Sequence, residues 1–476
     1  MTYGFNINYA YLQLNNHFYS ESVPLNFKSP SYKLFNHSLA KELSLSQTLH
    51  SQNGLNFLLN PKTHGLKSPV ALAYSGHQFA NYTLLGDGRA HLLFEHALKN
   101  DLYDIQLKGS GPTIYSRGFD GRLTLRSALL EYLMSEALHH LNIPTTRSLA
   151  VIKTNDHVKR ATLEDGALLL RVAKSHLRFG TFEYAYNHPD KTLLKQLVNY
   201  AINRHDKDLL NTEENYIKWF KRVIKRQALL IAKWQSIGFV HGVMNTDNAL
   251  ISGETIDYGP CAFIDTYNLQ SVYSSVDTLS RYAYGQQPYI GSWNLATLGK
   301  GLVSLINENT NQPINAIQNA LSEYGTIFEQ HYYQLMAKKI GIEHPNDSDI
   351  SLIDELLHMM AHYKQDYTNT FMHLTLQQYK DTPFYQSRAF AKWYEEWNAR
   401  LKKENNPYNR MQENNPFVIP RNHIVKKALD QAAYQDDFKA FNTLLKLVKN
   451  PYNQHKAPKY QTPPSNDEEV TTYCGT

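Results

Sequence analysis

The segment HGVMNTDNALISGETIDYG, residues 241–259, constrains the fold more than any other part of the chain. His241 opens it, Asn248 follows seven positions later, and Asp257 begins the triplet Asp-Tyr-Gly. This order is typical of a protein-kinase catalytic loop followed by the metal-binding DFG segment. A kinase has its catalytic aspartate two positions after the histidine, where this chain has Val243. The segment therefore predicts kinase-like metal ligands without a base in the usual place.

The polar residues of this segment predict a metal and nucleotide site. Asn248 and Asp257 offer hard oxygen ligands, which suit Mg²⁺ or Mn²⁺ bridging nucleotide phosphates. Asp247 is the nearest carboxylate that can replace the base missing at Val243. It can instead cap a turn or act as a third metal ligand. The sequence favours the role of base.

A glycine turn lies upstream, in GDGRA at residues 86–90. Gly86 and Gly88 would let the backbone approach phosphate oxygens closely, and Arg89 would add a bidentate donor. On its own, the pattern is more typical of a tight turn between strands. The motif becomes informative only in combination with a lysine and a glutamate further along the chain.

Lys108 ends the short apolar run DIQLKG, and the helical pattern of residues 122–141 carries Glu131 and Glu136. Glycine turn, strand lysine and helix glutamate follow one another in the same order in kinases. By itself, Lys108 could be a solvated strand end, and Asp120-Gly121 could form a simple turn. The order of the parts favours a nucleotide-binding unit.

Two arginines lie in LLLRVAKSHLRFGTFEY. Arg171 interrupts an apolar strand pattern, where an unpaired guanidinium would be costly to bury. We therefore expect Arg171 to meet a carboxylate or a phosphate, and the sequence leaves both open. Arg178 follows seven residues later, so the two arginines either share one face of a helix or lie on a strand and a following helix.

The order of elements predicts an α+β chain. Short strand patterns at residues 91–96, 104–109 and 168–173 precede mostly helical patterns beyond residue 190. Residues 1–75 are expected to be an irregular extension that packs on the rest. Residues 402–417 are rich in Asn and Pro and predict a long loop, whereas residues 424–448 predict one last helix.

Composition limits the classes of function. The chain has 476 residues, which exceeds one ordinary core, and a hydrophobic fraction of 42%. A net charge of +5 without a basic run does not indicate nucleic-acid binding. No apolar run reaches the ~18 residues of a membrane span, and the N-terminus does not resemble a signal peptide. Two cysteines fit a reducing compartment, so the cytoplasm is expected.

Five long strings carry a resemblance to a known family: YSGHQFANYTLLGDGRA, QLKGSGPTIYSRGFDGRLTLRSALLEYLMSEALHHLNIPTTRSL, LLRVAKSHLRFGTFEY, HGVMNTDNALISGETIDYGPCAFID and YAYGQQPYIGSWNL. The chain resembles the selenoprotein O family of protein adenylyltransferases, which have a pseudokinase fold. The resemblance implies a two-lobed, protein-kinase-like fold. Its parts would be an N-terminal extension (1–75), a strand-rich nucleotide-binding N-lobe (76–185), a helical C-lobe (186–450) and a C-terminal tail (451–476).

The resemblance also implies an activity and its residues. Members of the family bind ATP inverted relative to kinases and transfer AMP to Ser, Thr or Tyr hydroxyls of proteins, releasing pyrophosphate. Asp247 would be the base, Asn248 and Asp257 would hold Mg²⁺ or Mn²⁺, and Glu131 would orient Lys108. The positions implied to contact the nucleotide are Gly86, Gly88, Arg89, Lys108, Asp120, Gly121, Arg171, Arg178 and Asp257.

Some alternatives stay open. Cys474 stands where eukaryotic relatives have a selenocysteine. It is the better redox candidate of the two cysteines, and a spare exposed thiol is the alternative. Some bacterial relatives pair that position with a second cysteine, but Tyr273 stands there, so such a disulfide requires Cys261 instead. The sequence does not decide whether UTP replaces ATP. The rival functions are an ordinary phosphotransferase and a catalytically silent ATP-binding scaffold.

Overall fold

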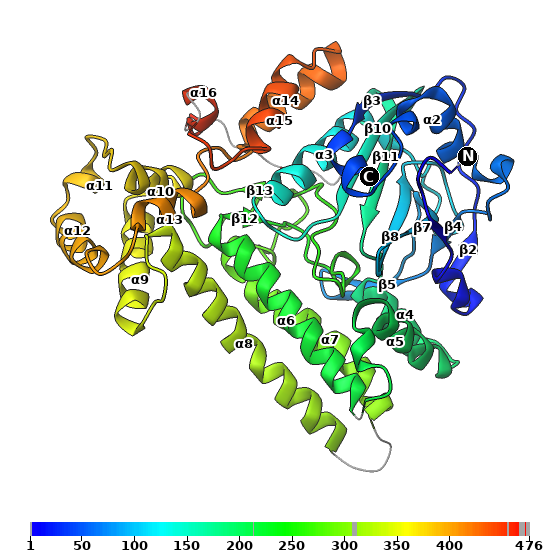
Figure 1. Ribbon diagram of the computed structural model, residues 1–476, viewed down its shortest axis with the longest axis horizontal. Coiled ribbons are helices and arrows are strands. Elements are labelled where there is room, and N and C mark those ends of the chain that lie inside the picture. The colour runs from blue at the N-terminus through cyan, green and yellow to red at the C-terminus, as the bar shows by residue number, and fades with distance from the viewer. Residues whose placement is uncertain (1, 213, 307–311, 455–456, 466–471, 473–476) are drawn as a thin grey trace.

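The centre of the molecule is an antiparallel sheet. The computed structural model describes residues 2–212, 214–306, 312–454, 457–465 and 472. Within these residues nine strands pair in the order β2-β4-β7-β8-β11-β10-β3, with β1 on β7 and β9 on β11 (Figure 1). Their bounds are β1 Ile7–Asn8, β2 Tyr19–Glu21, β3 Ser31–Phe35, β4 Val70–Leu72, β7 Ala90–Leu98, β8 Asp101–Lys108, β9 Leu123–Thr124, β10 Arg147–Lys159 and β11 Leu163–Ala173. The predicted α+β class is confirmed.

The three predicted strands are the middle of this sheet, β7, β8 and β11. In the register of β8 and β11, Gln106 lies opposite Arg171 and Lys108 lies opposite Leu169. Alternate residues of a strand share a face, so Gln106 and Lys108 lie on the same face of the sheet as Arg171. This face receives helix α3 (Leu125–His140), which agrees with the predicted helix 122–141.

The first 75 residues are more regular than expected. They supply β2 and β3 at the two ends of the strand order, together with helices α1 (His37–Glu42) and α2 (Gln52–Leu59). Leu55 and Phe57 of α2 are buried with Phe94 and Leu107 of the sheet. The extension therefore completes the sheet and its core.

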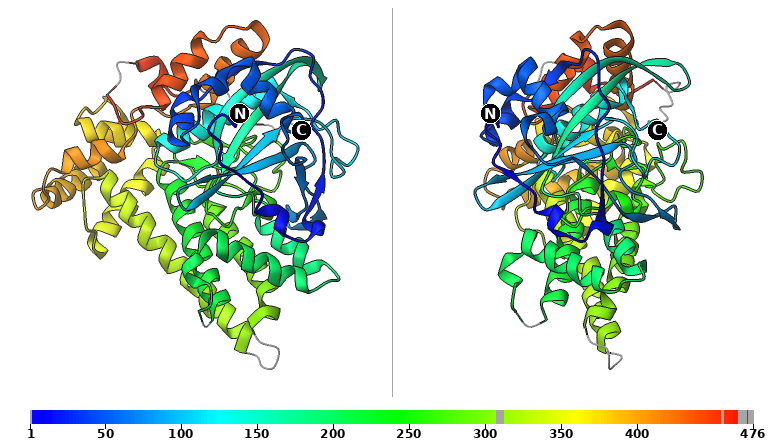
Figure 2. Two further views of the ribbon diagram at one scale, coloured as in Figure 1. Left: turned by 45° about the vertical axis from the view of Figure 1, so that its right-hand side comes forward. Right: turned by 90° about the vertical axis from the view of Figure 1, so that its right-hand side faces the viewer.

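Two predictions about the C-terminal part were wrong. Residues 402–417 contain helix α13 (Pro407–Asn414), which starts with a proline and buries Met411. The predicted helix 424–448 is two helices, α14 (Asn422–Gln435) and α15 (Lys439–Val448), because Asp436 adopts a left-handed backbone conformation with φ of 53°. Both helices pack with α3 in one apolar cluster, and they lie beside it in Figures 1 and 2.

The remaining helices form the lower and left-hand parts of Figure 1. They are α4 Phe179–Asn187, α5 Thr192–His205, α6 Asn215–Ser236, α7 Gln287–Ile306, α8 Gln312–Lys339, α9 Asp347–His362, α10 Tyr367–Leu376, α11 Pro383–Gln386, α12 Arg388–Leu401 and α16 Pro458–Gln461. Two short hairpins pair β5 (Ser75–Gln78) with β6 (Asn81–Leu84) and β12 (Phe239–Val240) with β13 (Ala262–Phe263). In the described part of the chain, no helix is long and apolar enough to cross a membrane.

One lysine is buried in the helical region without a carboxylate. Lys339, at the end of α8, is 3% exposed, and its Nζ lies 4.3 Å from the ring centroid of Phe371. Among the described residues no acidic group forms an ion pair with it. Burial disfavours the charged form and lowers the pKa of Lys339 to about 7. The charged side chain therefore costs stability at neutral pH.

Replacing Lys339 with methionine is expected to change how stability depends on pH. The folded-state pKa lies below the unfolded one, so the unfolded chain binds more protons between about pH 7 and 10.5. The free energy of unfolding of the wild type should therefore rise with pH relative to the variant, by up to about 1.4 kcal/mol per unit. Urea denaturation of both proteins from pH 7 to 10 measures this difference. The control is Lys392→Met, at a side chain that is 76% exposed. Equal pH dependence of stability in the wild type and Lys339→Met would contradict a lowered pKa of Lys339 in the folded protein.

Candidate active site

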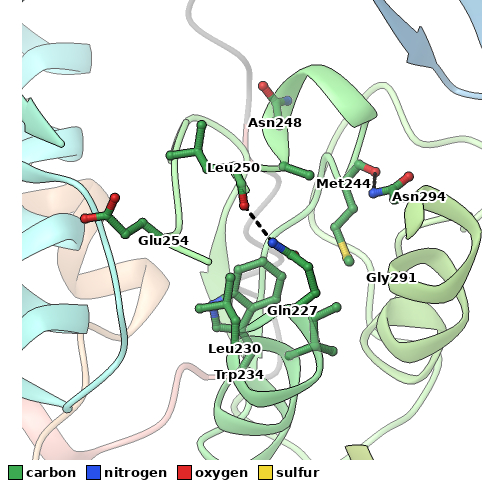
Figure 3. Close-up of a pocket in the computed structure, with 11 residues that line it drawn as sticks. Gln227, Leu230, Trp234, Met244, Asn248, Leu250, Glu254, Gly291 and Asn294 are labelled. Atoms are coloured by element: carbon green, nitrogen blue, oxygen red, sulfur yellow. Dashed lines mark hydrogen bonds between the residues drawn. The ribbon is translucent and has the colours of Figure 1, made fainter. Parts of the chain in front are cut away.

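Helices α6 and α7 hold the kinase-like loop in place. Gln227 of α6 donates from Nε2 to the Leu250 carbonyl at 2.7 Å, and Asn294 of α7 donates from Nδ2 to the Met244 carbonyl at 3.0 Å (Figure 3). The cavity between them has a volume of about 10 Å³, room for roughly one water molecule. Asn248 lies on the side of the loop away from the Gln227 side chain (Figure 3). The loop is thus fixed, with Asn248 facing away from its support.

Asp247 lies in the short 3₁₀ turn Thr246–Asn248 and is 7% exposed. Its Oδ2 accepts a long hydrogen bond of 3.4 Å from Gln78 Nε2, and its Oδ1 is buried without a hydrogen-bond partner. Burial raises the pKa of Asp247 to about 6, although the charge of Arg178 opposes the shift. The structure therefore contains a buried carboxylate with one free oxygen beside Asn248.

Strand β5 packs directly on this carboxylate. A methyl group placed on Gly76 would lie 2.4 Å from Asp247 Oδ1, so only glycine leaves room for the side chain. Gly76 and Gln78 face Asp247 from the same side of the strand. Sequence reasoning missed both residues, because their sequence distance from Asp247 gives no sign of the contact.

Because the resemblance implies that Asp247 is the base of AMP transfer, replacing Gly76 with alanine is expected to reduce that activity. The new methyl group must displace the carboxylate, and a misplacement of about 1 Å costs on the order of 10²-fold in rate. Steady-state rates with ATP and a protein acceptor measure the loss, and circular dichroism checks the fold. The control is Gly325→Ala in α8, where an added methyl group meets no atom within 4 Å. Unchanged kinetics for Gly76→Ala would show that the position of Asp247 does not matter.

Three cations surround Asp257. Lys108 Nζ donates to its Oδ1 at 2.9 Å, Arg171 Nη2 to the same oxygen at 3.1 Å, and Arg178 Nη1 to its Oδ2 at 3.1 Å. Burial alone would raise the pKa of Asp257, but these three charges hold it well below its ordinary value. Asp257 also has a positive φ of 64°, which is uncommon outside glycine and is found at functional sites. The carboxylate is ionised and shared by all three cations.

Glu131 of α3 completes the cluster. Its Oε1 accepts from Lys108 Nζ at 2.5 Å, and its Oε2 accepts from Arg171 Nη2 at 3.0 Å. The expected carboxylate partner of Arg171 is thus present twice, in Glu131 and Asp257. Glu136, the other helix glutamate, instead accepts from Arg147 at 2.8 Å. The structure brings together Lys108, Glu131, Arg171, Arg178 and Asp257.

Asp87 is a member of this cluster that sequence reasoning missed. It is 3% exposed, its Oδ2 accepts from Gln106 Nε2 at 3.0 Å, and its Oδ1 lies 3.9 Å from Arg178 Nη2. Burial raises the pKa of Asp87, and the nearby Arg178 opposes this. The available signal was an acidic residue between the two glycines of GDGRA.

The segment 109–122 covers the glycine turn. A methyl group on Gly86 would lie 2.3 Å from the Tyr115 ring, and Gly88 lies against the Tyr115 carbonyl. Thr113 donates from Oγ1 to the Asp87 carbonyl at 2.7 Å. In this structure, the two glycines contact Tyr115. Their contact with a nucleotide stays a prediction.

The other predicted nucleotide-binding positions lie around this segment. Asp120, with a side chain 41% exposed, pairs with Arg160 at 2.8 Å rather than with the buried cations. Gly121 packs against Gly111, with a positive φ of 64°. Burial is the main reason that the pKa of Lys108 is lowered, and the charge of Arg89 adds to it, which places Arg89 near the cluster.

Comparison with known proteins shows which family the chain belongs to. The family model described as "Protein adenylyltransferase SelO" matches residues 3–449. The chain belongs to the SelO family. A relative from Clostridium perfringens named "Protein nucleotidyltransferase YdiU" is 48% identical over 481 residues, covering 99% of this chain and 98% of the relative. One of the same name from Geobacillus kaustophilus is 46% identical over 484 residues, covering 100% of both chains.

The structure describes only one of the two cysteines of this SelO-family chain. Cys261 is a free thiol, 3% exposed, and burial raises its pKa, so it is a small core residue. Cys474 lies outside the described residues. A redox role of Cys474 stays a prediction.

Proposed function

We propose that this SelO-family protein transfers AMP from ATP to Ser, Thr or Tyr hydroxyls of other proteins and releases pyrophosphate. The observation that carries the proposal is the position of Asp247. It is a buried carboxylate with a free oxygen next to Asn248, whereas the position of a kinase base holds the apolar Val243. The acceptor hydroxyl would lose its proton beside Asp247 rather than at the kinase position.

Three cations would bind the phosphates of ATP. Lys108, Arg171 and Arg178 are at most 4% exposed and converge on the carboxylate of Asp257. In AMP transfer, negative charge grows on the bridging oxygen and on the leaving pyrophosphate, and fixed cations stabilise it. Glu131 would hold Lys108 and Arg171 in place, because it accepts a hydrogen bond from each.

AMP transfer forms one bond and breaks another at the α-phosphorus. The acceptor oxygen forms a bond to the α-phosphorus, and the bond between that phosphorus and the pyrophosphate oxygen breaks. The hydroxyl proton would pass to Asp247 Oδ1, which has no other partner. An unperturbed aspartate with a pKa of ~3.9 is a weak base for a tyrosine near ~10. Burial raises the pKa of Asp247 to about 6, which reduces the difference in pKa between the base and the hydroxyl.

The residues fit a divalent metal. Asn248 donates from Nδ2 to the Val243 carbonyl at 3.1 Å, which leaves its amide oxygen as a ligand, and Asp257 is ionised. In the described part of the chain, no three His, Cys, Asp or Glu side chains gather as a metal cage. Two protein oxygens with phosphate oxygens suit Mg²⁺ or Mn²⁺. Bound there, the metal would neutralise phosphate charge.

We extend the proposal to the fold and the remaining positions. The chain would have the two-lobed, kinase-like organisation, with a nucleotide-binding N-lobe over residues 76–185 and a helical C-lobe over 186–450, and ATP would lie between the lobes. Gly86, Gly88, Arg89, Asp120 and Gly121 would contact the nucleotide, which requires the Tyr115 ring to move away from the first glycine. Proteins with hydroxyl side chains would be the partners, with no nucleic acid and no membrane, and the cytoplasm would be the location.

Product analysis tests the proposal. The protein is incubated with ATP, Mg²⁺ or Mn²⁺ and a bacterial lysate depleted of nucleotides, and pyrophosphate and ADP are separated by chromatography. We expect pyrophosphate to form in proportion to modified protein, and Asp257→Ala to abolish it. ADP formed in proportion to modified protein would support an ordinary phosphotransferase instead.

A further inference from the structure

A second cavity lies on the other face of strand β5 from Asp247. Because Gly76 and Gln78 face Asp247, the side chain of His77 between them points the opposite way. There it borders a cavity of about 190 Å³ between the β5–β6 hairpin, α4 and α7. Its aromatic and ionisable lining residues are His77, Tyr82, Phe182, Glu183, Tyr186 and Lys300.

Glu183 provides a buried carboxylate at the wall of this cavity. Its side chain is 4% exposed, and Oε2 lies 2.5 Å from His77 Nδ1. Oε1 is buried without a hydrogen-bond partner. Burial raises the pKa of the Glu183 carboxyl, although the Thr246 hydroxyl and His77 oppose the shift. A buried carboxylate oxygen without a full set of donors is costly. Glu183 therefore brings to the cavity wall a buried carboxylate with one oxygen that lacks a hydrogen bond.

The walls suit a long side chain that carries a positive charge. The aromatic residues Tyr82, Phe182 and Tyr186 line the cavity together with Glu183. Such rings cover the aliphatic stem of lysine or arginine and attract the cation. Tyr82 is 41% exposed, so the cavity is accessible from the surface at the hairpin.

The cavity adjoins the place of the proposed reaction. His77 donates from its backbone N–H to Thr246 Oγ1 at 2.7 Å, and Thr246 precedes Asp247. Gly76, which contacts Asp247, and His77, which borders the cavity, have Cα atoms about 3.8 Å apart. Asp247 and the cavity therefore lie close together, on the two faces of one short strand.

We infer that this cavity binds an arginine or lysine side chain of the protein substrate, close in sequence to the modified hydroxyl. The inference rests on the proposed function, because it assigns one part of substrate recognition. Glu183 is then a specificity-determining residue. Lys300 lies at the rim and is exposed, so its charge opposes the bound cation and limits affinity.

Immobilised peptide libraries test the inference. Each peptide has a central Ser, Thr or Tyr, degenerate flanks, and either arginine or its neutral, apolar counterpart norleucine fixed at one flanking position. Enzyme bound to each spot and AMP transferred from α-labelled ATP are measured separately. At one flanking position we expect arginine to exceed norleucine by at least about tenfold in binding, the scale of one charge-assisted contact. Glu183→Gln should remove this preference, and Lys300→Glu should increase it.

The control variant is Lys195→Glu, an exposed lysine on α5 that does not line the cavity and should leave the preference unchanged. Lys300→Glu keeps the test valid if Glu183→Gln folds poorly, because it alters only an exposed side chain. Binding that prefers arginine without AMP transfer would overturn the proposed function and support the pocket. No preference for arginine at any flanking position, or one that both cavity variants leave intact, would overturn the inference whether or not AMP is transferred.

Discussion

Replacing Asp247 with asparagine is expected to lower the rate of AMP transfer by about 10²–10⁴-fold, the usual contribution of a general base. Asparagine keeps the size of the side chain and the hydrogen bond with Gln78, but it cannot take up the proton. Because the wild-type carboxylate is buried with one oxygen unpartnered, the variant should be at least as stable as the wild type. ATP affinity should change little, since the cations around Asp257 stay in place.

Three measurements check this prediction: AMP transfer to protein, ATP binding by calorimetry, and the melting temperature. The control is Asp430→Asn, an aspartate of α14 that is 39% exposed and paired with Arg126. It should leave all three values unchanged. A transfer rate within about threefold of the wild type in Asp247→Asn would contradict the role of Asp247 as a base.

Replacing Arg171 with methionine is expected to destabilise the protein by about 3–5 kcal/mol, as breaking a buried ion pair does. Arg171 is 2% exposed and donates to Glu131 and Asp257, which would keep their charges without this partner. Glu131 would then keep only Lys108, whereas Asp257 would keep Lys108 and Arg178. The midpoint of urea denaturation measures the loss, and ATP binding should weaken as well.

Arg222 offers a matched control, because it also pairs with two aspartates, Asp206 and Asp208. Its side chain is 39% exposed, so solvent screens its charge, and the buried Asp206 keeps a second partner in Arg226. Arg222→Met should cost no more than about 1 kcal/mol. Equal losses of stability in the two variants would show that burial of the cluster does not increase the contribution of Arg171.

The central strands and helix α3 could be predicted because their apolar patterns are local. The split between α14 and α15 could not, since it depends on the left-handed backbone of Asp436, and aspartate only sometimes adopts that conformation. Helix α13 was missed because Asn and Pro dominate its first turn, while burial of Met411 stabilises it. Short polar helices of this kind depend on tertiary packing.

The candidate site, too, could be predicted only in part from the sequence. Lys108, Glu131 and Asp257 could be proposed from the order of kinase-like motifs, and the structure brings them into contact. Asp87 and Gly76 were missed, because their roles arise from contacts that exist only in the folded chain. The pair of His77 and Glu183 joins residues 106 positions apart, and neither belongs to a motif that predicts the contact.

The most direct measurement is transfer of label from ATP carrying radioactive phosphorus at either the α- or the γ-position. Asp247, the phosphate-binding cations and the apolar Val243 predict that protein retains label only from the α-position, and that Asp247→Asn removes most of it. Retention only from the γ-position would contradict AMP transfer and establish an ordinary phosphotransferase. No retention from either position with Mg²⁺ or Mn²⁺ would also contradict it and leave a silent nucleotide-binding protein.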